Sequence, residues 1–310
     1  MPVTQDELIE SLEATYNIHI INCVPGPRQI VAQTYIVDDA TGKQYFCKII
    51  DHHLLIPGII QTLPVVEQMY KNGIDKICYP IHGNKGLYFY IGHSLVVLFN
   101  YIPVTQGINY NSYILGSMIA NVHAITPKIT AAAPLENFEF PNRDFFIESL
   151  DGTLQSNNPD IVVQQLKILL QEHEAEVRKY MDEFATIAAS CKANTKSLVL
   201  THGDLGNNIL AKTPDDLYII DWDEMRLAPA ERDVFMNDEN AEFMAGYKSI
   251  RPDFIVDLEL RRFCILQRYF ERMNIYFTQI LDNTNPNEYR LDRLQRFAKG
   301  RLAGDCVPKL

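Results

Sequence analysis

Hydrophobic and polar residues follow two different periods along the chain, and the change of period divides the sequence. Within residues 17–50 lie three short apolar runs rich in β-branched and aromatic residues, and a turn of small and polar residues at 38–43 separates the last two. Runs of this kind are typical of strands joined by a hairpin. Two further runs of the same type lie at 86–92 and 94–102. Together they predict a small antiparallel sheet.

Two stretches of this first part have helical spacing instead. Within residues 4–16, apolar side chains recur at every fourth position from Leu8, as on one face of a helix. A second helix is predicted within residues 58–73, with Pro64 in its first turns and Gly73 as its stop. The first part of the chain is therefore a sheet with one helix inserted between its strands.

From Pro103 onward the apolar residues recur mostly at helical spacing. Helices are predicted at 112–125, across 166–188, at 240–250 and at 253–281. The exception is the stretch 197–221, where short apolar runs separated by Gly, Asn and Asp predict small strands. The pattern predicts an α+β protein, with a small antiparallel sheet part over residues 1–101 and a larger, mainly helical part over residues 102–310.

Composition narrows the possible classes of protein. Of the 310 residues 47% are hydrophobic, which is typical of a globular chain with a packed core. A formal net charge of -11 argues against nucleic acid or anionic lipid as partners and permits a cationic small molecule. We see neither a signal peptide nor an apolar run long enough to span a membrane. The six cysteines form no Cys-x-x-Cys pair, which favours reduced thiols in the cytoplasm.

The polar residues around the predicted small strands are those that phosphoryl transfer requires. His202 and Asp204 lie on the turn after the first of these strands. Asn208 opens the second strand, and Asp221 ends the third. A carboxylate can orient or deprotonate an attacking hydroxyl, while an amide oxygen and a second carboxylate can hold magnesium on the phosphates. The general kinase pattern of H-R-D, Asn and a later Asp is present here with Gly203 in second place.

Each of these residues also has a structural interpretation. An aspartate beside a glycine commonly caps a turn, which would explain Asp204 without catalysis. Asp221 could simply end a strand, although an ionised group after so apolar a run needs a partner and a cation supplies one. We expect His202 to be structural and to bond backbone near the loop. The residues taken together favour phosphoryl transfer over the separate structural interpretations.

At these positions the sequence resembles the aminoglycoside phosphotransferases and related small-molecule kinases, whose fold is like that of protein kinases. Their loop typically reads H-G-D-L-x-x-x-N-I-L, and residues 202–210 read HGDLGNNIL. Their metal aspartate lies in an I-D-W or I-D-F segment, matched by IIDWDE at 219–224. The run LAPAERDVFM at 227–236 is similar to the branch that contains spectinomycin phosphotransferases. The resemblance implies a two-lobed protein-kinase-like fold, with residues 1–101 as the nucleotide-binding lobe and residues 102–310 carrying the catalytic and metal loops and the acceptor site.

The resemblance also implies a role for each matching residue of the loop. Asp204 would be the catalytic residue that orients the acceptor hydroxyl, and Asn208 and Asp221 would bind Mg²⁺. The family places its Asn five residues after the Asp, whereas 208 minus 204 is four. Because one residue moves the backbone by about 3.5 Å, the loop must differ locally, and Asn207 is the alternative ligand.

In the first part of the chain the resemblance assigns the nucleotide contacts. Lys48 would pair with the phosphates of ATP, and Glu67 would be its acidic partner on the neighbouring helix. Lys48 could instead extend to solvent from an edge strand, and Glu67 could be an exposed helix residue. The backbone from Phe99 to Tyr101 would contact adenine, and the turn at 25–33 would cover the phosphates.

Acidic residues of the helical part are candidates for the acceptor site, because ammonium groups of an aminocyclitol would pair with carboxylates. They are Asp223, Glu224, Asp238, Glu239 and Glu242. Asp223 and Glu224 could instead form ion pairs with Arg226, and Asp233 is expected to brace the segment that follows it. The resemblance thus predicts an ATP- and Mg²⁺-dependent kinase acting on spectinomycin or another aminoglycoside-like antibiotic. The alternatives are a metabolic kinase for choline, a sugar or an amino alcohol, and a nucleotide-binding protein without turnover.

Overall fold

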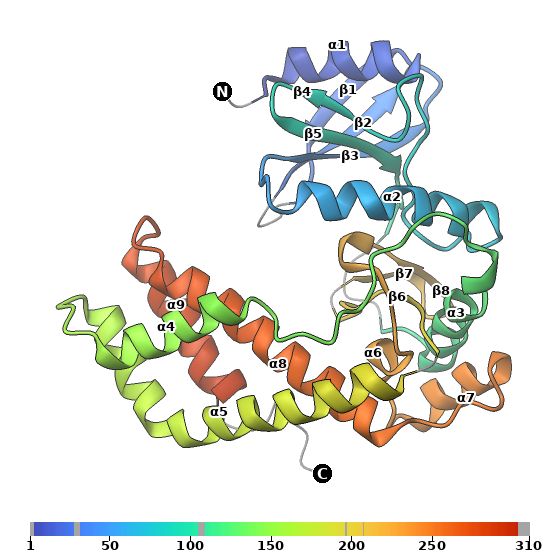
Figure 1. Ribbon diagram of the computed structural model, residues 1–310. Helices are drawn as coiled ribbons and strands as arrows, with labels where there is room; N and C mark the ends of the chain where they lie inside the picture. The colour runs from blue at the N-terminus through green and yellow to red at the C-terminus, as the bar shows by residue number, and fades with distance from the viewer. Residues whose placement is uncertain (1–2, 28–31, 105–108, 196, 207, 303–310) are drawn as a thin grey trace. The chain divides into compact units, whose positions relative to one another are not determined.

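The chain folds into two compact units, each of which is made of two separate segments. The computed structural model describes residues 3–27, 32–104, 109–195, 197–206 and 208–302 (Figure 1). The first unit comprises Met1–Glu136 with Leu198–Phe254, and the second comprises Asn137–Ser197 with Ile255–Leu310. The predicted sheet and the predicted catalytic loop therefore belong to the same unit. The predicted division of the chain into a nucleotide-binding lobe, residues 1–101, and a second lobe, residues 102–310, stays a prediction.

The first unit opens with a capped helix and an antiparallel sheet. Helix α1 (Gln5–Tyr16) begins after Thr4, whose hydroxyl accepts a hydrogen bond from the Glu7 amide at 3.3 Å. The five strands of the sheet have the order β1-β2-β3-β5-β4 (Figure 1). Their bounds are β1 Ile20–Pro25, β2 Ala32–Asp39, β3 Gln44–Ile50, β4 Phe89–Ile91 and β5 Ser94–Asn100. The predicted antiparallel sheet, including the hairpin of β2 and β3, is confirmed.

Helix α2 (Ile56–Lys71) begins earlier than the sequence predicted. Pro57 lies in the first turn of the helix. Amide hydrogens in that turn have no acceptor within the helix, so the lack of one in proline costs no hydrogen bond. Pro64 lies inside the helix, so its predicted place in the first turns is wrong. The helix ends as expected before Gly73, whose φ of 95° is readily adopted only by glycine.

The sheet buries a different apolar cluster on each face, because successive strand residues point to opposite sides. Cys47 and Ile49 of the central strand β3 belong to the cluster packed against α1. Phe46 and Ile50 belong to the cluster packed against α2. By this alternation Lys48, which lies between the latter two along β3, is on the face that α2 covers.

The rest of the first unit surrounds the predicted catalytic loop. Its elements are α3 Ser112–Ala124, η1 Thr126–Lys128, β6 Val199–Thr201, β7 Ile209–Thr213, β8 Asp216–Ile219, η2 Trp222–Glu224, β9 Arg226–Ala228, α6 Glu231–Val234 and α7 Ala241–Ile250. Strand β6 pairs with β9 and β7 pairs with β8, both antiparallel. The predicted small strands are confirmed, and β9 is an element that the sequence pattern did not indicate.

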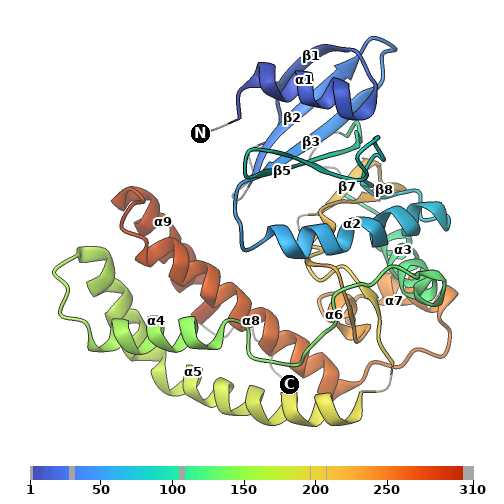
Figure 2. The ribbon, with the colours of Figure 1, turned by 45° about the horizontal axis from the view of Figure 1, so that its top comes forward.

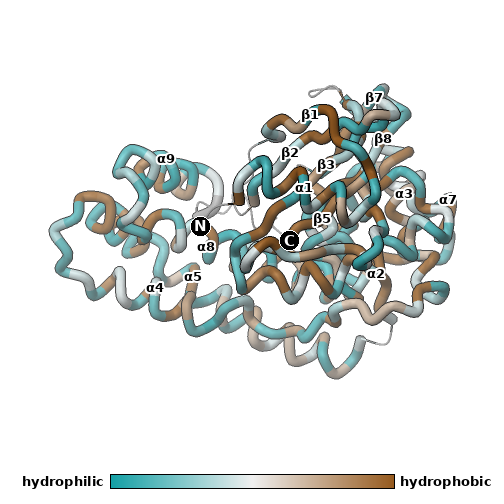
Figure 3. Tube along the Cα trace, turned by 90° about the horizontal axis from the view of Figure 1, so that it is seen from above, coloured by the Kyte–Doolittle hydropathy of each residue, from teal (hydrophilic) through white to brown (hydrophobic). Residues whose placement is uncertain are grey.

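All the secondary-structure elements in the described part of the second unit are helices. It contains α4 Arg143–Gln155, α5 Ile161–Asn194, α8 Leu258–Leu281, α9 Asn287–Phe297 and the π-helical turn η3 Ala298–Leu302. Figures 1 and 2 both place α4, α5 and α8 side by side. Hydrophilic and hydrophobic segments alternate along α5 and α8 in Figure 3, as expected for helices with one buried face. None of the helices in the described part of the chain combines the length and apolar character of a membrane span.

Helices α3 and α7 of the first unit approach each other at two glycines, which gives a test of this packing. A Cβ at Gly116 would overlap the Phe243 carbonyl oxygen, and one at Gly246 would overlap the Tyr113 carbonyl oxygen. We expect Gly116→Ala to lower the free energy of unfolding by about 1–3 kcal/mol in urea denaturation, because backbone atoms cannot rotate away. The control is Gly58→Ala in α2, where an added Cβ meets nothing within 4 Å. If both variants match the wild type, the close approach is refuted.

Candidate active site

The loop that carries Asp204 is held by a buried carboxylate from α6. Asp233 accepts the His202 N–H at 2.8 Å and the Gly203 N–H at 2.7 Å, one on each carboxylate oxygen. Burial alone would raise the pKa of Asp233, but a 3.1 Å bond to the His123 ring, together with the nearby His202 and Arg232, lowers it below its usual range. The sequence predicted that Asp233 braces the segment after it. It instead braces a loop 30 residues earlier in the chain.

Gly203 is required in this loop for two reasons. Its φ is 85°, a backbone conformation that residues with a Cβ rarely adopt. In addition, a Cβ at this position would overlap the guanidinium of Arg232. That guanidinium donates to the Thr201 hydroxyl at 3.0 Å and to the Glu224 carbonyl oxygen at 3.2 Å. The Arg232 side chain of α6 therefore packs directly on the backbone of the loop.

His202 orients the loop from a fully buried position. Its Nδ1 accepts the Asp204 N–H at 3.1 Å, and its Nε2 donates to the Ile220 carbonyl oxygen at 2.8 Å. This arrangement needs the neutral ring, and burial lowers the pKa of His202 accordingly. The prediction that His202 bonds backbone near the loop is confirmed. The two bonds connect the segment of Asp204 with the one that ends at Asp221.

The β7–β8 hairpin brings the two predicted metal ligands together. The Asn208 carbonyl oxygen accepts the N–H of Ile220, the residue before Asp221, at 2.9 Å. The side-chain nitrogen of Asn208 donates to the Asp204 carbonyl oxygen at 2.7 Å, so the amide oxygen is the atom suited to a cation. Asp221 has the left-handed backbone angles φ 62° and ψ 66°, which are uncommon outside functional sites and turns. Asn207, the alternative ligand, lies outside the described residues.

These residues fit a magnesium site that is completed by a nucleotide. Mg²⁺ prefers oxygen ligands and usually keeps several from water and phosphate. Among the residues that the structure describes, no group of three or more His, Cys, Asp and Glu side chains could hold a metal ion by itself. Asn208 and Asp221 supply an amide oxygen and a carboxylate, which is the number of protein ligands expected when phosphates supply others.

Lys48 is buried, and its ammonium lies between two carboxylates. Its Nζ is 2.5 Å from Oδ2 of Asp223 and 3.1 Å from Oδ1 of Asp221, and the side chain is 5% exposed. Burial alone would lower the pKa of Lys48, but the charges of Asp223 and Asp221 outweigh it and raise the pKa. The structure thus brings the predicted phosphate-binding lysine to the predicted metal aspartate. It excludes the alternative that Lys48 extends to solvent from an edge strand.

The structure does not bring Glu67 to Lys48. The carboxylate of Glu67 is 2.8 Å from Lys71 Nζ and 3.0 Å from the His82 ring. It lies one helical turn beyond Leu63, the last α2 residue in the apolar cluster under the sheet. The expected ion pair with Lys48 is therefore replaced by contacts near the end of the helix.

The segment predicted to contact adenine lies at the end of β5. Phe99 is paired with Phe46 of β3, and Tyr101 directly follows the strand. Between them, Asn100 donates its N–H to the Tyr79 carbonyl oxygen at 3.1 Å and accepts the Tyr79 N–H on its side chain at 2.6 Å. The adenine contact stays a prediction. Of the turn predicted to cover the phosphates, residues 28–31 lie outside the described residues.

The acidic acceptor candidates are in different surroundings. The carboxylate of Asp223 is engaged by Lys48, whereas Glu224 and Glu239 are exposed. Arg226, the expected alternative partner of Asp223, is instead 3.3 Å from Glu136. Asp223 is thus the candidate whose environment differs most from the expectation.

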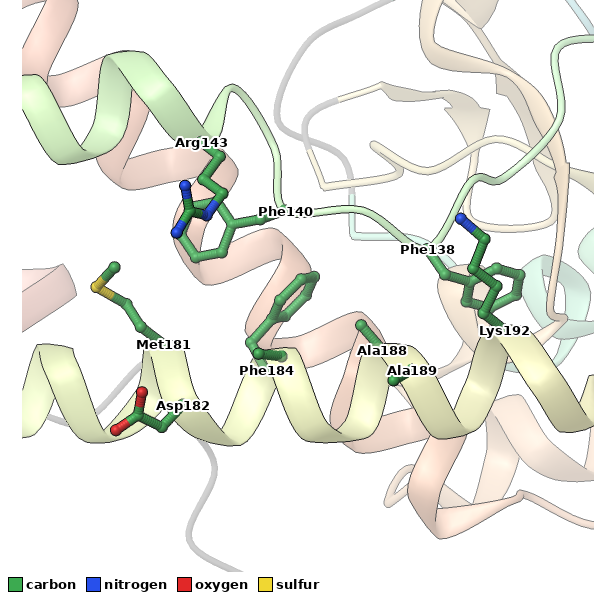
Figure 4. A pocket seen from close by; sticks show the side chains of 10 residues that line it. Phe138, Phe140, Arg143, Met181, Asp182, Phe184, Ala188, Ala189 and Lys192 are labelled. Carbon is green, nitrogen blue, oxygen red and sulfur yellow. The ribbon is translucent and has the colours of Figure 1, made fainter.

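The second unit has a groove of its own, between the segment that precedes α4 and the helix α5 (Figure 4). Its volume is about 400 Å³. The lining residues are Phe138, Phe140, Arg143, Met181, Asp182, Phe184, Ala185, Ala188, Ala189 and Lys192. Asp182 is the one acidic residue of this lining, so the groove lacks the carboxylate cluster expected for a cationic acceptor.

Comparison with known proteins supports the fold. Neither a protein-family model nor a curated protein matches the sequence significantly. Among solved structures, spectinomycin phosphotransferase APH(9)-Ia in complex with ADP and spectinomycin has a TM-score of 0.77 at 22% identity, covering 99% of this chain and 97% of that chain. Amicoumacin kinase hAmiN with AMP-PNP and Ca²⁺ has a TM-score of 0.62 at 16% identity over 98% and 95%. The microcompartment-associated aminopropanol kinase has a TM-score of 0.60 at 15% identity, covering 97% of this chain and 95% of that chain. The predicted protein-kinase-like fold of small-molecule phosphotransferases is confirmed.

The bracing of the loop by Asp233 can be tested by removing its charge. In Asp233→Asn one of the two backbone N–H groups loses its acceptor in a buried position. We expect the free energy of unfolding to fall by about 3 kcal/mol or more in urea denaturation. The control Asp216→Asn removes the partner of the half-exposed Lys76 and should cost less than about 1 kcal/mol. Similar losses in the two variants would contradict the bracing role.

The buried histidines of this site predict a stability that declines in mild acid. The pKa values of His202 and His123 are both lowered, chiefly by burial. Below the ordinary value of about 6.5 the unfolded chain therefore binds more protons than the folded chain. From about pH 7.5 to about pH 5.5 we expect each histidine to remove about 1 kcal/mol from the free energy of unfolding. His202→Asn should lose its share of this dependence, and an unchanged pH dependence in that variant would rule out the contribution.

Proposed function

We propose that the chain is an ATP-dependent phosphotransferase that moves the γ-phosphoryl group of ATP to a hydroxyl of a small molecule. The observation that carries this proposal is the meeting of Lys48, Asp221 and the loop of Asp204 in one unit. Lys48 Nζ lies 3.1 Å from Asp221, and Asn208 is bonded both to Asp204 and to the residue before Asp221. A cation for phosphate, two metal ligands and a carboxylate for the hydroxyl are thereby adjacent.

Each residue would act through position and charge. Asp204 orients the acceptor hydroxyl and takes its proton as the phosphoryl group moves. Lys48 contacts the phosphates, and Asn208 and Asp221 would hold Mg²⁺, which would supply positive charge next to the phosphates. Because the transition state is loose, alignment and charge neutralisation account for most of the rate.

Several features support nucleotide as the co-substrate. Among the solved structures of similar fold, that of spectinomycin phosphotransferase contains ADP, and that of amicoumacin kinase contains AMP-PNP and Ca²⁺. In this chain the backbone from Phe99 to Tyr101 is the proposed adenine contact, at the end of the strand next to Lys48. We place the enzyme in the cytoplasm, with neither nucleic acid nor membrane as a partner, in accord with its negative charge.

For the acceptor we propose spectinomycin or another aminoglycoside-like antibiotic. Two observations support this proposal. The TM-score with spectinomycin phosphotransferase, 0.77, is higher than those with amicoumacin kinase and aminopropanol kinase. The sequence LAPAERDVFM at 227–236 also resembles the branch that contains spectinomycin phosphotransferases. The exposed carboxylates of Glu224 and Glu239 are candidates to pair with ammonium groups of the acceptor. A metabolic kinase for choline, a sugar or an amino alcohol is the alternative, favoured by the similarity to aminopropanol kinase.

Transfer of radiolabelled phosphate from ATP to a panel of acceptors tests the proposal. The panel contains spectinomycin, an aminoglycoside, choline, a sugar and an amino alcohol, with and without Mg²⁺. We expect Asp204→Asn to lower turnover by about 10²–10⁴-fold, since proton transfer to a positioned base contributes that much. Nucleotide affinity, measured by calorimetry, should persist in this variant. The control Asp216→Asn should retain both phosphate transfer and nucleotide affinity.

The outcomes separate the alternatives. Transfer to choline, the sugar or the amino alcohol, but to no antibiotic, would favour a metabolic kinase. No transfer at all, with thermal stabilisation by nucleotide that ignores Mg²⁺, would favour a nucleotide-binding protein without turnover. Equal turnover of Asp204→Asn and the wild type would remove Asp204 from its proposed role.

A further inference from the structure

The buried ammonium of Lys48 requires an acidic anchor, and α2 does not provide one where the two elements meet. The neighbours of Lys48 on the same face of β3, Phe46 and Ile50, pack with Ile59 and Leu63 of α2. The α2 side chains of this cluster are apolar, and the one acidic residue in the helix, Glu67, lies one turn beyond them. An ammonium in such surroundings is unfavourable without a nearby negative charge.

Asp223 supplies this charge from a rigid turn. Its Oδ2 is 2.5 Å from Lys48 Nζ, closer than the 3.1 Å contact of Asp221. Between the two acids along the chain, Trp222 is 4% exposed and donates its ring N–H to the Ile219 carbonyl oxygen at 3.2 Å. The Trp222 ring also packs edge-on to His202, with the centroids 4.7 Å apart. The turn η2 is thus anchored to the same buried histidine that orients the catalytic loop.

We propose that Asp223 is the positioning residue that holds Lys48 at the phosphate site. It takes the part that the resemblance assigned to Glu67, whose carboxylate is occupied by Lys71 and His82. The functional meaning of this contact rests on the proposed phosphotransferase activity. With Asp223 as the permanent partner of Lys48, Asp221 is available for the metal ion, and the acidic residue two positions after the metal aspartate serves the nucleotide rather than the acceptor.

The other titratable groups near Lys48 do not replace Asp223. Cys78 is close enough to interact with the ammonium, but burial raises the pKa of its thiol to about 12, so it is neutral at physiological pH. Asp221 is also in contact with the ammonium, at 3.1 Å, yet it is the proposed metal ligand. If Asp221 were the sole counter-charge of Lys48, Mg²⁺ and the ammonium would compete for it.

The test measures how well Lys48 is protected from labelling in nucleotide-free protein. Acetylation of Lys48 by acetic anhydride at one fixed pH is followed by mass spectrometry. In Asp223→Asn we expect the rate of labelling to rise by about tenfold or more, because Lys48 loses its nearer carboxylate partner. Asp216→Asn, which removes the carboxylate partner of Lys76, should leave the labelling rate of Lys48 unchanged. Glu67→Gln should leave it unchanged as well.

The opposite pattern, in which Glu67→Gln raises the labelling rate and Asp223→Asn does not, would overturn the proposal. Thermal denaturation checks that each variant is folded. Should Asp223→Asn not fold, Asp223→Glu is used, because its longer side chain shifts the carboxylate relative to Lys48; a labelling rate equal to that of the wild type would then refute the anchoring role. The labelling requires neither nucleotide nor acceptor. Absence of phosphate transfer by the wild type would therefore contradict the proposed function while leaving this measurement interpretable.

If the wild type transfers phosphate, the kinetic constants give a second test. A loosened Lys48 would bind phosphates less well and align them less well, so kcat/KM for ATP should fall by about 10- to 100-fold in Asp223→Asn. KM for the acceptor should stay within about twofold, because Asp223 contacts Lys48 and not the acceptor. A selective rise in the acceptor KM would instead assign Asp223 to acceptor binding and contradict the positioning role.

Discussion

The candidate active site depends on one buried carboxylate. Asp233 accepts both backbone amides that precede Asp204 and contacts His123 of α3, so it ties α3 and α6 to the catalytic loop. Charge-assisted bonds of this kind are about twice as strong as neutral ones, and burial removes the competition of water. The loop therefore has its conformation before any substrate binds, which is the condition under which a positioned carboxylate is most effective.

A second buried charge is managed differently. The ammonium of Lys48 is buried, but it is compensated by two carboxylates that are each about one third exposed, so both carboxylates remain accessible to solvent. In the proposed enzyme the triphosphate and the carboxylates are all negative and all attracted to the same ammonium. A divalent ion held by Asp221 would offset this repulsion. In the proposed enzyme, binding of nucleotide and binding of metal would therefore be coupled through Lys48.

Local sequence patterns were sufficient wherever neighbours along the chain decide the structure. The strands and the β2–β3 hairpin follow from short apolar runs and turn residues, and α1 follows from apolar residues at every fourth position. The loop around Asp204 was recognisable because its residues are adjacent in the sequence. The start of α2 was not, since Pro57 and Pro64 have the same local preference and only packing against the sheet selects the earlier proline as the first turn.

By itself, the sequence determined the fold class and the residue types of the site, because periodicity and a contiguous motif are local properties. Only the tertiary structure decided the partners of these residues. Asp223 is 175 positions from Lys48, and Asp233 is 31 positions from His202, so neither contact has a local signature. The nearer acid, Glu67, was the natural expectation for Lys48. In the structure Glu67 contacts Lys71 and His82 instead, while α2 places apolar side chains against the sheet at the level of Lys48. This arrangement of the core appears only when helix and sheet are packed together.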